Sequence, residues 1–423
     1  MNDEITRSIQ IIRKNIHASY LGMFREAGSP FLYPFLTPGS EQYADVLWDW
    51  DSWLSNVALR QILAEVGDEA RIQEARPYER GCVQNYLSWG SMDGWIPIVV
   101  GRGADVTAIK PSDIYSANMH KPVLAQHAAF LVQQDGGDAE WLREGFYFLQ
   151  TFLNNYRNHH RHASGLYFWQ NDSAIGVDND PCTYFRPPRS SGSIYLNCLM
   201  YRELLAIVYL CNCLNLDEVG QHFQRDADYL REAIREHCWD ERDGFFYSVD
   251  LNLLPNTNIT GLHFGMPRDW DTLIMRIGVW SGFLALWAEV ATPEQAERVV
   301  KENYLDACTF YAPFGVRTLS KMEKMYNLRA TGNPSSWLGP VWGVSNYLTF
   351  RGLLKYGFTQ EAQELAEKTI RLFGRDFERF GGLHEYYQPE NGEPILNRGF
   401  QNWNFLVLNM ANWLEGKPPV WEF

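Results

Sequence analysis

Apolar residues recur at helical spacing along most of the chain. In the first predicted helix, Ile5, Ile9, Ile12 and Ile16 form one apolar stripe. Acidic residues at the start and glycines at the end mark other helix boundaries. The pattern predicts twelve helices: 3–27, 51–66, 69–88, 121–134, 138–160, 190–214, 217–237, 271–289, 293–305, 335–356, 359–375 and 400–414.

These predicted helices are of two kinds. The helices 217–237 and 359–375 are amphipathic, with charged residues on one side. Others are apolar nearly all round, as expected for helices surrounded by protein; they are 190–214, 271–289, 335–356 and 400–414. The alternation of exposed and buried helices predicts an outer and an inner ring.

Strand signals are few, so the pattern indicates an all-α protein. The turn pair Asp243-Gly244 before the apolar run 245–249 predicts a short hairpin, and 165–167 and 381–383 offer weaker strand signals. No βαβ alternation is present. The sequence Gly101-Arg102-Gly103 is not followed by a helix, so it does not support a nucleotide site.

Polar and aromatic residues gather just before the predicted inner helices. The clusters are 47–51, 118–121, 167–189, 268–271, 335–342 and 397–403. One such cluster would fit an ordinary helix cap, but clusters on alternate helices would all meet at one end of an inner ring. The arrangement predicts an (α/α)6 barrel with short β-hairpins in the loops at its active-site end. We expect one catalytic domain over 1–423, with long active-site loops near 90–120, 160–190 and 376–399.

The richest cluster is the loop 167–189, which carries Asp172, Asp178 and Asp180 among aromatic and amide side chains. Loops of this composition are usually functional. Aromatic faces beside hydrogen-bonding groups suit a sugar. The alternative, a hydrogen-bonded loop with a half-buried aromatic plug, stays open from this segment alone.

Composition narrows the possible partners. The net charge of -14 argues against nucleic acid and anionic membranes. The seven cysteines include no C-x-x-C pair, and Cys211 and Cys213 fall in an apolar helix, so we expect buried thiols and a cytoplasmic protein. The N-terminus does not resemble a signal peptide. No apolar run reaches about 18 residues, so no membrane-spanning helix is expected.

The candidate chemistry is acid/base catalysis by two carboxylates. His159, His160 and His162 lack supporting ligands, so we interpret them as solvated and expect no metal or other cofactor. Glycosidic cleavage needs a protonated acid at the leaving oxygen and a carboxylate that activates water or attacks. Asp178 is the candidate acid, since partial burial would raise its pKa. Glu385 is the candidate base, although a surface carboxylate in a loop would fit its pattern equally well.

Four ordered motifs resemble glycoside hydrolase family 63 and the related trehalases. The segment 176–179 is similar to the loop that carries the family's general acid, and Trp50-Asp51-Ser52 to the trehalase signature. The segment 337–347 resembles the Gly-Pro-x-Trp…Asn-Tyr stretch, and 384–392 the base-bearing segment. The resemblance implies an inverting exo-α-glycosidase with Asp178 as acid and Glu385 as base.

The compact chain looks most like the bacterial mannosylglycerate and glucosylglycerate hydrolases of this family. That resemblance implies hydrolysis of 2-O-α-mannosyl- or glucosyl-glycerate. Asp51 would hold sugar hydroxyls, and a cationic or donor-rich subsite would receive the glycerate. The implied sugar walls are Trp48, Trp50, Trp169 and Trp342; the leaving-group candidates are Lys121, Arg186, Arg189, Tyr387 and Gln401; Gln170, Asn179 and Trp403 complete the expected binding residues.

Other interpretations of the sequence remain open. The substrate is another small α-glucoside in one of them. A sugar epimerase on the same barrel would use a histidine pair, for which His120 and His384 are the candidates. A sugar-binding protein without turnover is the third. In each case the expected partner is a small sugar, with no nucleic acid and no membrane. The oligomeric state stays open, a homo-oligomer included.

Overall fold

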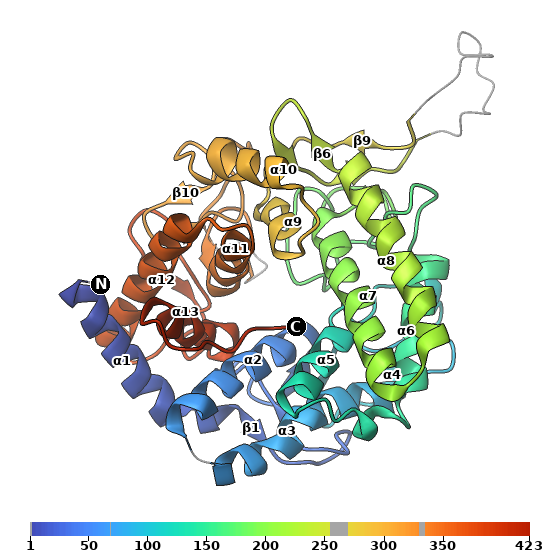
Figure 1. Ribbon diagram of the computed structural model, residues 1–423, viewed down its shortest axis with the longest axis horizontal. Coiled ribbons are helices and arrows are strands. Elements are labelled where there is room, and N and C mark those ends of the chain that lie inside the picture. The colour runs from blue at the N-terminus through green and yellow to red at the C-terminus, as the bar shows by residue number, and fades with distance from the viewer. Residues whose placement is uncertain (1, 68, 254–269, 330–334) are drawn as a thin grey trace.

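The computed structural model describes residues 2–67, 69–253, 270–329 and 335–423. Within these ranges the helices form a closed ring, and the first helix of the chain packs against the last long helix of the outer side (Figure 1). The helices are α1 Asp3–Ser19, α2 Asp49–Val66, α3 Glu69–Ser88, α4 Val106–Ile109, α5 Leu124–Gln134, α6 Phe146–His159, α7 Ile194–Leu214, α8 Asp217–His237, α9 Leu284–Trp287, α10 Pro293–Arg298, α11 Gly343–Lys355, α12 Thr359–Phe380 and α13 Val407–Leu414.

The ring has two layers. The inner layer consists of α2, α5, α7, α9, α11 and α13, each of which contacts the next, with α13 returning to α2. The outer layer consists of α1, α3, α6, α8, α10 and α12 (Figure 1). This is the (α/α)6 barrel that the alternation of apolar and amphipathic helices predicted.

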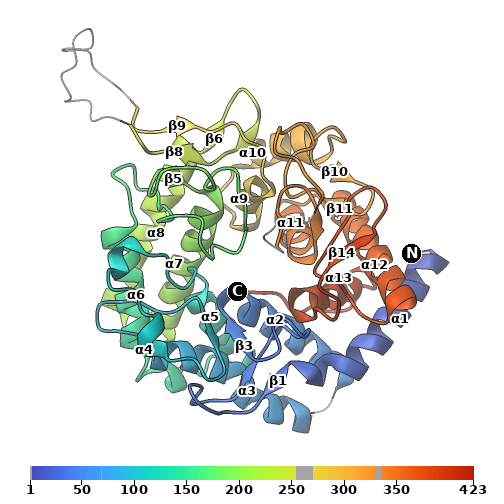
Figure 2. The same ribbon diagram turned by 180° about the vertical axis from the view of Figure 1, so that it is seen from behind.

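Short strands occupy the loops and come to the front when the barrel is seen from behind (Figure 2). They pair antiparallel as β1–β2, β3–β4, β5–β8–β9, β6–β7, β10–β11 and β12–β13–β14. Their bounds are β1 Phe24–Arg25, β2 Phe35–Leu36, β3 Val46–Trp48, β4 Val99–Gly101, β5 Ser191–Gly192, β6 Trp239–Asp240, β7 Phe245–Phe246, β8 Val249–Asp250, β9 Leu273–Ile274, β10 Tyr311–Ala312, β11 Gly315–Val316, β12 Val341–Trp342, β13 Tyr386–Tyr387 and β14 Pro394–Leu396.

The predicted hairpin around Asp243-Gly244 is present, because β6 pairs with β7 across that turn. The two weaker strand signals were wrong. The segment 165–167 provides a single bridge, Arg161 to Tyr167. The segment 381–383 forms no strand, and β13 begins only at Tyr386.

Several inner helices begin later than predicted, because their polar-aromatic clusters are extended or form 3₁₀ turns. β5 and β12 precede α7 and α11, and a 3₁₀ turn over Asn402–Leu406 precedes α13. The largest error is 271–289. Its first part pairs as β9 with β8, and a 3₁₀ turn over Trp280–Phe283 leads into the short α9.

Some outer helices also differ from the prediction. α1 ends at Ser19, since the chain beyond it pairs as β1 with β2. α6 begins only at Phe146, whereas α12 continues to Phe380. The predicted helix 293–305 is α10 followed by a π-helical turn, Val299–Tyr304. Arg268, Asp269 and Pro334, which helped to define two predicted helix starts, lie outside the described residues.

The inner helix α7 is long and apolar enough by composition to cross a membrane. However, 78% of its apolar window is buried inside the barrel, as in a core helix. No other helix among the described ranges meets both conditions. Of the two α7 cysteines, Cys211 is buried as predicted, whereas Cys213 is only half-buried.

Candidate active site

A cavity of about 360 Å³ opens at the loop end of the barrel. Its lining side chains come from eight parts of the chain. These are the segment that leads into β3 together with β3 itself, α2, the segment before α5, the 160–190 loop, the segment before α11, β12, the segment before β13, and the 3₁₀ turn before α13. The lining residues are Gln42, Tyr43, Trp48, Trp50, Asp51, Lys121, Asp172, Ser173, Ala174, Gly176, Asp178, Ser335, Trp342, Glu385 and Trp403. Five of the six predicted clusters therefore contribute to one cavity, and the sixth, 268–271, lies partly outside the described residues.

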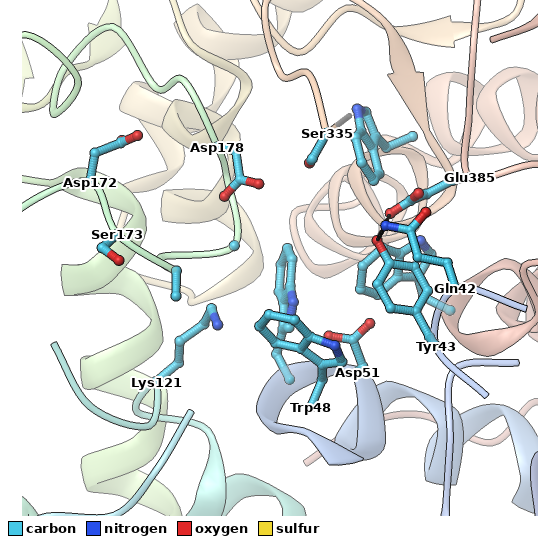
Figure 3. A pocket seen from close by; sticks show the side chains of 15 residues that line it. Gln42, Tyr43, Trp48, Asp51, Lys121, Asp172, Ser173, Asp178, Ser335 and Glu385 are labelled. Carbon is cyan, nitrogen blue, oxygen red and sulfur yellow. Dashed lines mark hydrogen bonds between the residues drawn. The ribbon is translucent and has the colours of Figure 1, made fainter. Parts of the chain in front are cut away.

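Asp178 and Glu385 reach into this cavity from opposite sides (Figure 3). Asp178 is half-buried, whereas Glu385 is only 4% exposed. The burial of Glu385 raises its pKa to about 7, and the nearby Asp178 carboxylate adds to the increase. A carboxylate with this pKa can exchange a proton near neutral pH.

Two donors hold the Glu385 carboxylate. The Tyr43 hydroxyl donates to Oε1 at 3.2 Å, and the Asn397 amide donates to Oε2 at 3.1 Å. Both bonds favour the ionised form and act against the effect of burial. Burial also raises the pKa of the Tyr43 hydroxyl far above its ordinary value, so this group remains a donor. The arrangement fits a base whose orientation is fixed.

Asp51 lies below the other two carboxylates and points into the same cavity (Figure 3). It occupies the first turn of α2, and the side-chain amide of Asn402 donates to its Oδ1. Ser55 donates in turn to the side-chain Oδ1 of Asn402 at 3.0 Å, which fixes the orientation of the amide. Burial, followed by the charge of Asp49, raises the pKa of Asp51 well above its ordinary range.

Lys121 is a buried cation at the cavity wall, already paired with Asp49. Its Nζ lies 2.8 Å from Asp49 Oδ1, and both side chains are fully buried. The backbone N–H of Lys121 donates to the other carboxylate oxygen at 2.9 Å. The ammonium also lies 5.7 Å from the Trp50 ring centroid. Lys121 therefore links the segment before α5 to the start of α2 at the cavity wall.

The loop that carries Asp178 is fitted closely over Trp50 and Lys121. Gly176 has φ +93, and a Cβ there would lie 2.6 Å from Lys121 Cε. Glycine is therefore needed both for backbone conformation and for space. Asn179 also has positive φ, 63, and its side chain donates to the Ser335 carbonyl at 3.1 Å. These contacts place the Asp178 carboxylate at the cavity.

Stacked aromatic rings form one wall. The rings of Trp337 and Trp342 are 4.3 Å apart and nearly parallel at 12°, and Tyr386 stacks on Trp342 at 4.7 Å. Trp50 and Trp403 meet edge-to-face at 5.0 Å. Of these rings, Trp342, Trp50 and Trp403 line the cavity, where they offer apolar contact surface to a sugar ring.

Seven of the expected binding residues, Arg186 among them, do not line this cavity. Trp169 and Gln170 are buried within the loop 167–189, and the side-chain amide of Asn179 donates to the backbone carbonyl of Ser335. Arg189 donates to Gln170 Oε1 at 2.6 Å. Tyr387 donates to Asp376 at 2.7 Å, and Gln401 donates to the Ser19 carbonyl. The polar groups of Asn179, Arg189, Tyr387 and Gln401 therefore bond to other parts of the protein and not to a ligand in the cavity.

Histidines are also absent from the described lining. The His120 ring is buried against Tyr86, and His384 contacts Asp376 at 3.0 Å. The prediction that 159–162 is solvated was wrong for His160, which is fully buried next to Tyr156 because the loop folds over it. Among the described residues, no group of three or more potential metal ligands is present.

Sequence reasoning missed Gln42 and Tyr43 as cavity residues, and within the clusters it named it did not assign Asp172, Ser173, Ala174 and Ser335 to the site. The nearest signal for the first two was the position of this segment just before Trp48. Asp172 and Ser173 belong to the loop that was singled out, but no pattern distinguishes the acids that face the cavity. Asn402 was overlooked in favour of its neighbour Gln401.

Comparison with known proteins gives a family match over most of the chain. The family model described as "Mannosylglycerate hydrolase MGH1-like glycoside hydrolase domain" matches residues 44–404. Mannosylglycerate hydrolase MGH1 of Selaginella moellendorffii is 29% identical over 396 residues, covering 82% of this chain and 76% of that protein. A probable trehalase of Eremothecium gossypii is 26% identical over 222 residues, which span only 26% of its length. The mannosylglycerate hydrolase of Rubrobacter radiotolerans is 26% identical, with 39% of its length matched.

Solved structures share the fold. The GH63 mannosylglycerate hydrolase of Thermus thermophilus in complex with glucose superposes with a TM-score of 0.63 at 18% identity, covering 97% of this chain and 99% of that chain. The neutral trehalase Nth1 of Saccharomyces cerevisiae gives a TM-score of 0.60 at 16% identity, covering 96% and 82%.

Proposed function

The chain belongs to the mannosylglycerate hydrolase MGH1-like family of glycoside hydrolases, and from this premise we propose that it is an inverting exo-α-glycosidase acting on a small α-hexoside. The observation that carries the proposal is the placement of Asp178 and Glu385 on opposite sides of one cavity (Figure 3). The proposed substrate lies between them, with its anomeric carbon facing Glu385.

In the proposed reaction Asp178 is the acid and Glu385 the base. Asp178 gives its proton to the glycosidic oxygen as the bond from that oxygen to the anomeric carbon breaks. Glu385 takes a proton from a water molecule whose oxygen forms the new bond on the opposite face of the ring. Inversion of this kind calls for carboxyls separated by about 6.5–9.5 Å, which leaves room for the water.

The remaining cavity residues bind the hexose in this proposal. Asp51, held by Asn402, accepts hydrogen bonds from sugar hydroxyls, and the aromatic wall around Trp342 packs against the ring. A cavity of about 360 Å³ suits a compound of about disaccharide size. We therefore propose an exo-acting enzyme on a small glycoside rather than an enzyme for long chains.

The proposed leaving group follows the relatives, which are named as mannosylglycerate hydrolases and trehalases. Candidate substrates are 2-O-α-mannosyl- or glucosyl-glycerate and trehalose-like α-glucosides. The epimerase alternative is disfavoured, because neither His120 nor His384 lines the cavity. We further propose that 1–423 acts as one catalytic domain in the cytoplasm, with a sugar as its partner.

The experiment that tests the proposal is NMR observation of the first sugar released. Glucosylglycerate, mannosylglycerate and trehalose are offered in parallel. From either glycerate compound the initial sugar is expected to be the β-anomer, and from trehalose equal amounts of β- and α-glucose, because the leaving glucose keeps its α configuration. Initial release of the α-anomer from a glycerate compound, or of α-glucose alone from trehalose, would contradict inversion and the role of Glu385 as the base. Interconversion of substrate and a 2-epimer without hydrolysis would favour the epimerase instead.

A further inference from the structure

The charge of the cavity lining is strongly one-sided. Among the described lining residues, four carry carboxyl groups: Asp51, Asp172, Asp178 and Glu385. The cation in that set, Lys121, is fully buried and bonded to Asp49. Its charge is therefore largely balanced before any substrate enters.

Asp172 lies on the acid's side of the cavity. In Figure 3, Asp178 stands between Asp172 and Glu385. The charge of Asp178 raises the pKa of both of these neighbours, so Asp178 is within electrostatic reach of each. An inverting glycosidase protonates the leaving oxygen on the acid's side and brings water to the opposite face. Asp172 and the adjacent Ser173 are therefore positioned beside the leaving group.

The cations expected for a glycerate subsite are engaged elsewhere. Arg186 forms a 2.5 Å ion pair with Asp250, and Arg189 donates to Gln170 and Ser116. Neither lines the cavity. The leaving-group side, as far as the structure describes it, carries acid without a free base.

Resting on the proposed function, we infer that the leaving group is uncharged and polyhydroxylated, a polyol such as glycerol or a second neutral sugar, and that Asp172 selects it over glycerate. Burial, with Asp180 and Asp178, already disfavours the Asp172 charge and raises its pKa to about 7. Its Oδ1 is buried without a hydrogen-bond partner among the described residues. A hydroxyl can donate to this carboxyl, whereas a second carboxylate would add like-charge repulsion.

A matched pair of substrates tests the inference. 2-O-α-glucosylglycerol and 2-O-α-glucosylglycerate differ only by a hydroxymethyl group in place of a carboxylate, and the mannosyl pair differs in the same way. We expect kcat/KM to favour the glycerol glycoside by at least about 100-fold, since like-charge contacts cost several kcal/mol and each 1.4 kcal/mol is tenfold. Trehalose, measured alongside, distinguishes a sugar leaving group from a polyol. Equal or better use of the glycerate compound would overturn the inference.

The Asp172→Asn variant identifies the residue responsible. It is expected to lower the ratio of kcat/KM for the glycerol glycoside to kcat/KM for the glycerate glycoside by about tenfold or more. Most of this change should come from a higher kcat/KM for the glycerate glycoside. Glu297→Gln, which removes one negative charge from the exposed side of α10, is the matched control and should leave the ratio unchanged. An unchanged ratio in Asp172→Asn would contradict the selective role of this residue.

Binding separates this inference from the proposed reaction. Calorimetric titration of Asp178→Asn with the same pair measures leaving-group preference without turnover. Tighter binding of the glycerol glycoside supports the inference even if the wild type hydrolyses neither compound, in which case only the proposed reaction fails. Equal or tighter binding of the glycerate compound, or binding of neither, overturns the inference.

Discussion

The hydrogen bonds to Glu385 show how individual side chains adjust the pKa of the proposed base. Burial raises its pKa to about 7, while Tyr43 and Asn397 stabilise the charge. As a base, Glu385 acts in its ionised form. The value of kcat/KM should therefore fall as the pH falls through about 7.

Replacing Tyr43 by Phe removes one of these donors. The pKa of Glu385 should then rise further, and the acidic limb of the pH–rate profile should move upward by about half to one pH unit, because such a bond is worth about 1 kcal/mol. The exposed Tyr229→Phe is the control, and its profile should match the wild type. An unmoved limb in Tyr43→Phe would mean that Glu385 does not govern it.

Removing either proposed catalytic group should affect rate more than binding. Asp178→Asn and Glu385→Gln are each expected to lower kcat by about 10²–10⁴-fold, the usual contribution of an acid or base. Steady-state kinetics measures the rate, and titration of each variant with the substrate that it does not hydrolyse measures the binding. A variant that keeps the wild-type rate would exclude that residue from the chemistry.

The sequence could predict the residues whose local motif points to the site. Asp178, Glu385, Asp51 and the tryptophans Trp48, Trp50, Trp342 and Trp403 all line the cavity. Tyr43 and Asn402 could not be found this way, because each acts on a residue more than 300 positions away. Arg189 was predicted to contact the leaving group but does not line the cavity. A local pattern does not show which way a loop side chain points.

At the scale of elements, one inner helix is capped by its neighbour. Val123, at the start of α5, provides no side-chain cap. Instead, Glu203 of α7 accepts the backbone N–H groups of Ala125 and Gln126 at 2.7 and 3.0 Å. Glu203 is fully buried, and burial raises its pKa to about 8.

The variant Glu203→Ala would leave two buried helix N–H groups without partners. We expect its free energy of unfolding to fall by about 2–4 kcal/mol, since each unsatisfied group costs roughly 1–3. Urea denaturation followed by circular dichroism measures this change. Glu236→Ala, at an exposed position of α8, is the control and should have a small effect. Equal stability of both variants would show that water replaces the cap.

The existence of most helices was predictable, whereas their starting points were not. Periodicity reports which face is buried, and the amphipathic α8 was predicted with its observed bounds. At α9 and α11 the backbone N–H groups before the helix bond to other loops, as when Met275 donates to the Ser248 carbonyl. Such partners lie far away in sequence, and periodicity carries no information about them.

At the scale of the whole molecule, the last residues of the chain pack into the centre of the ring (Figures 1 and 2). Glu422 is fully buried at its side chain and bonds to Arg351 at 2.9 Å and to Tyr347 at 2.6 Å. Burial alone would raise its pKa, but Arg351, Lys355 and Tyr347 outweigh that effect and lower it from 4.5 to about 2. The ring has the same fold as the solved GH63 mannosylglycerate hydrolase, and the chain belongs to the mannosylglycerate hydrolase MGH1-like family of glycoside hydrolases.

A lowered folded-state pKa means that the Glu422 contribution to stability is fully present above pH 4.5 and is lost as the pH falls toward 2. Glu422→Gln should therefore destabilise the protein near neutral pH by about 3 kcal/mol, the scale for breaking a buried ion pair. The difference from the wild type should shrink between these two pH values. Urea midpoints at pH 7 and pH 3 test this.

The pair of Glu378 with Arg7 provides the comparison for that prediction, because both side chains are exposed. Glu378→Gln should change stability little at either pH, as is usual for surface pairs. If the two variants behaved alike, the buried contacts of Glu422 would not be a major source of stability.

The parallel stack of Trp337, Trp342 and Tyr386 also has an optical consequence. Rings this close and this nearly parallel couple their electronic transitions, so the site should contribute a distinct band to the near-ultraviolet circular dichroism spectrum. Tyr386 comes from a different segment from the two tryptophans, so its part in the band depends on intact tertiary packing. A sugar that settles against Trp342 should alter it, which gives a binding signal that needs neither turnover nor a labelled ligand.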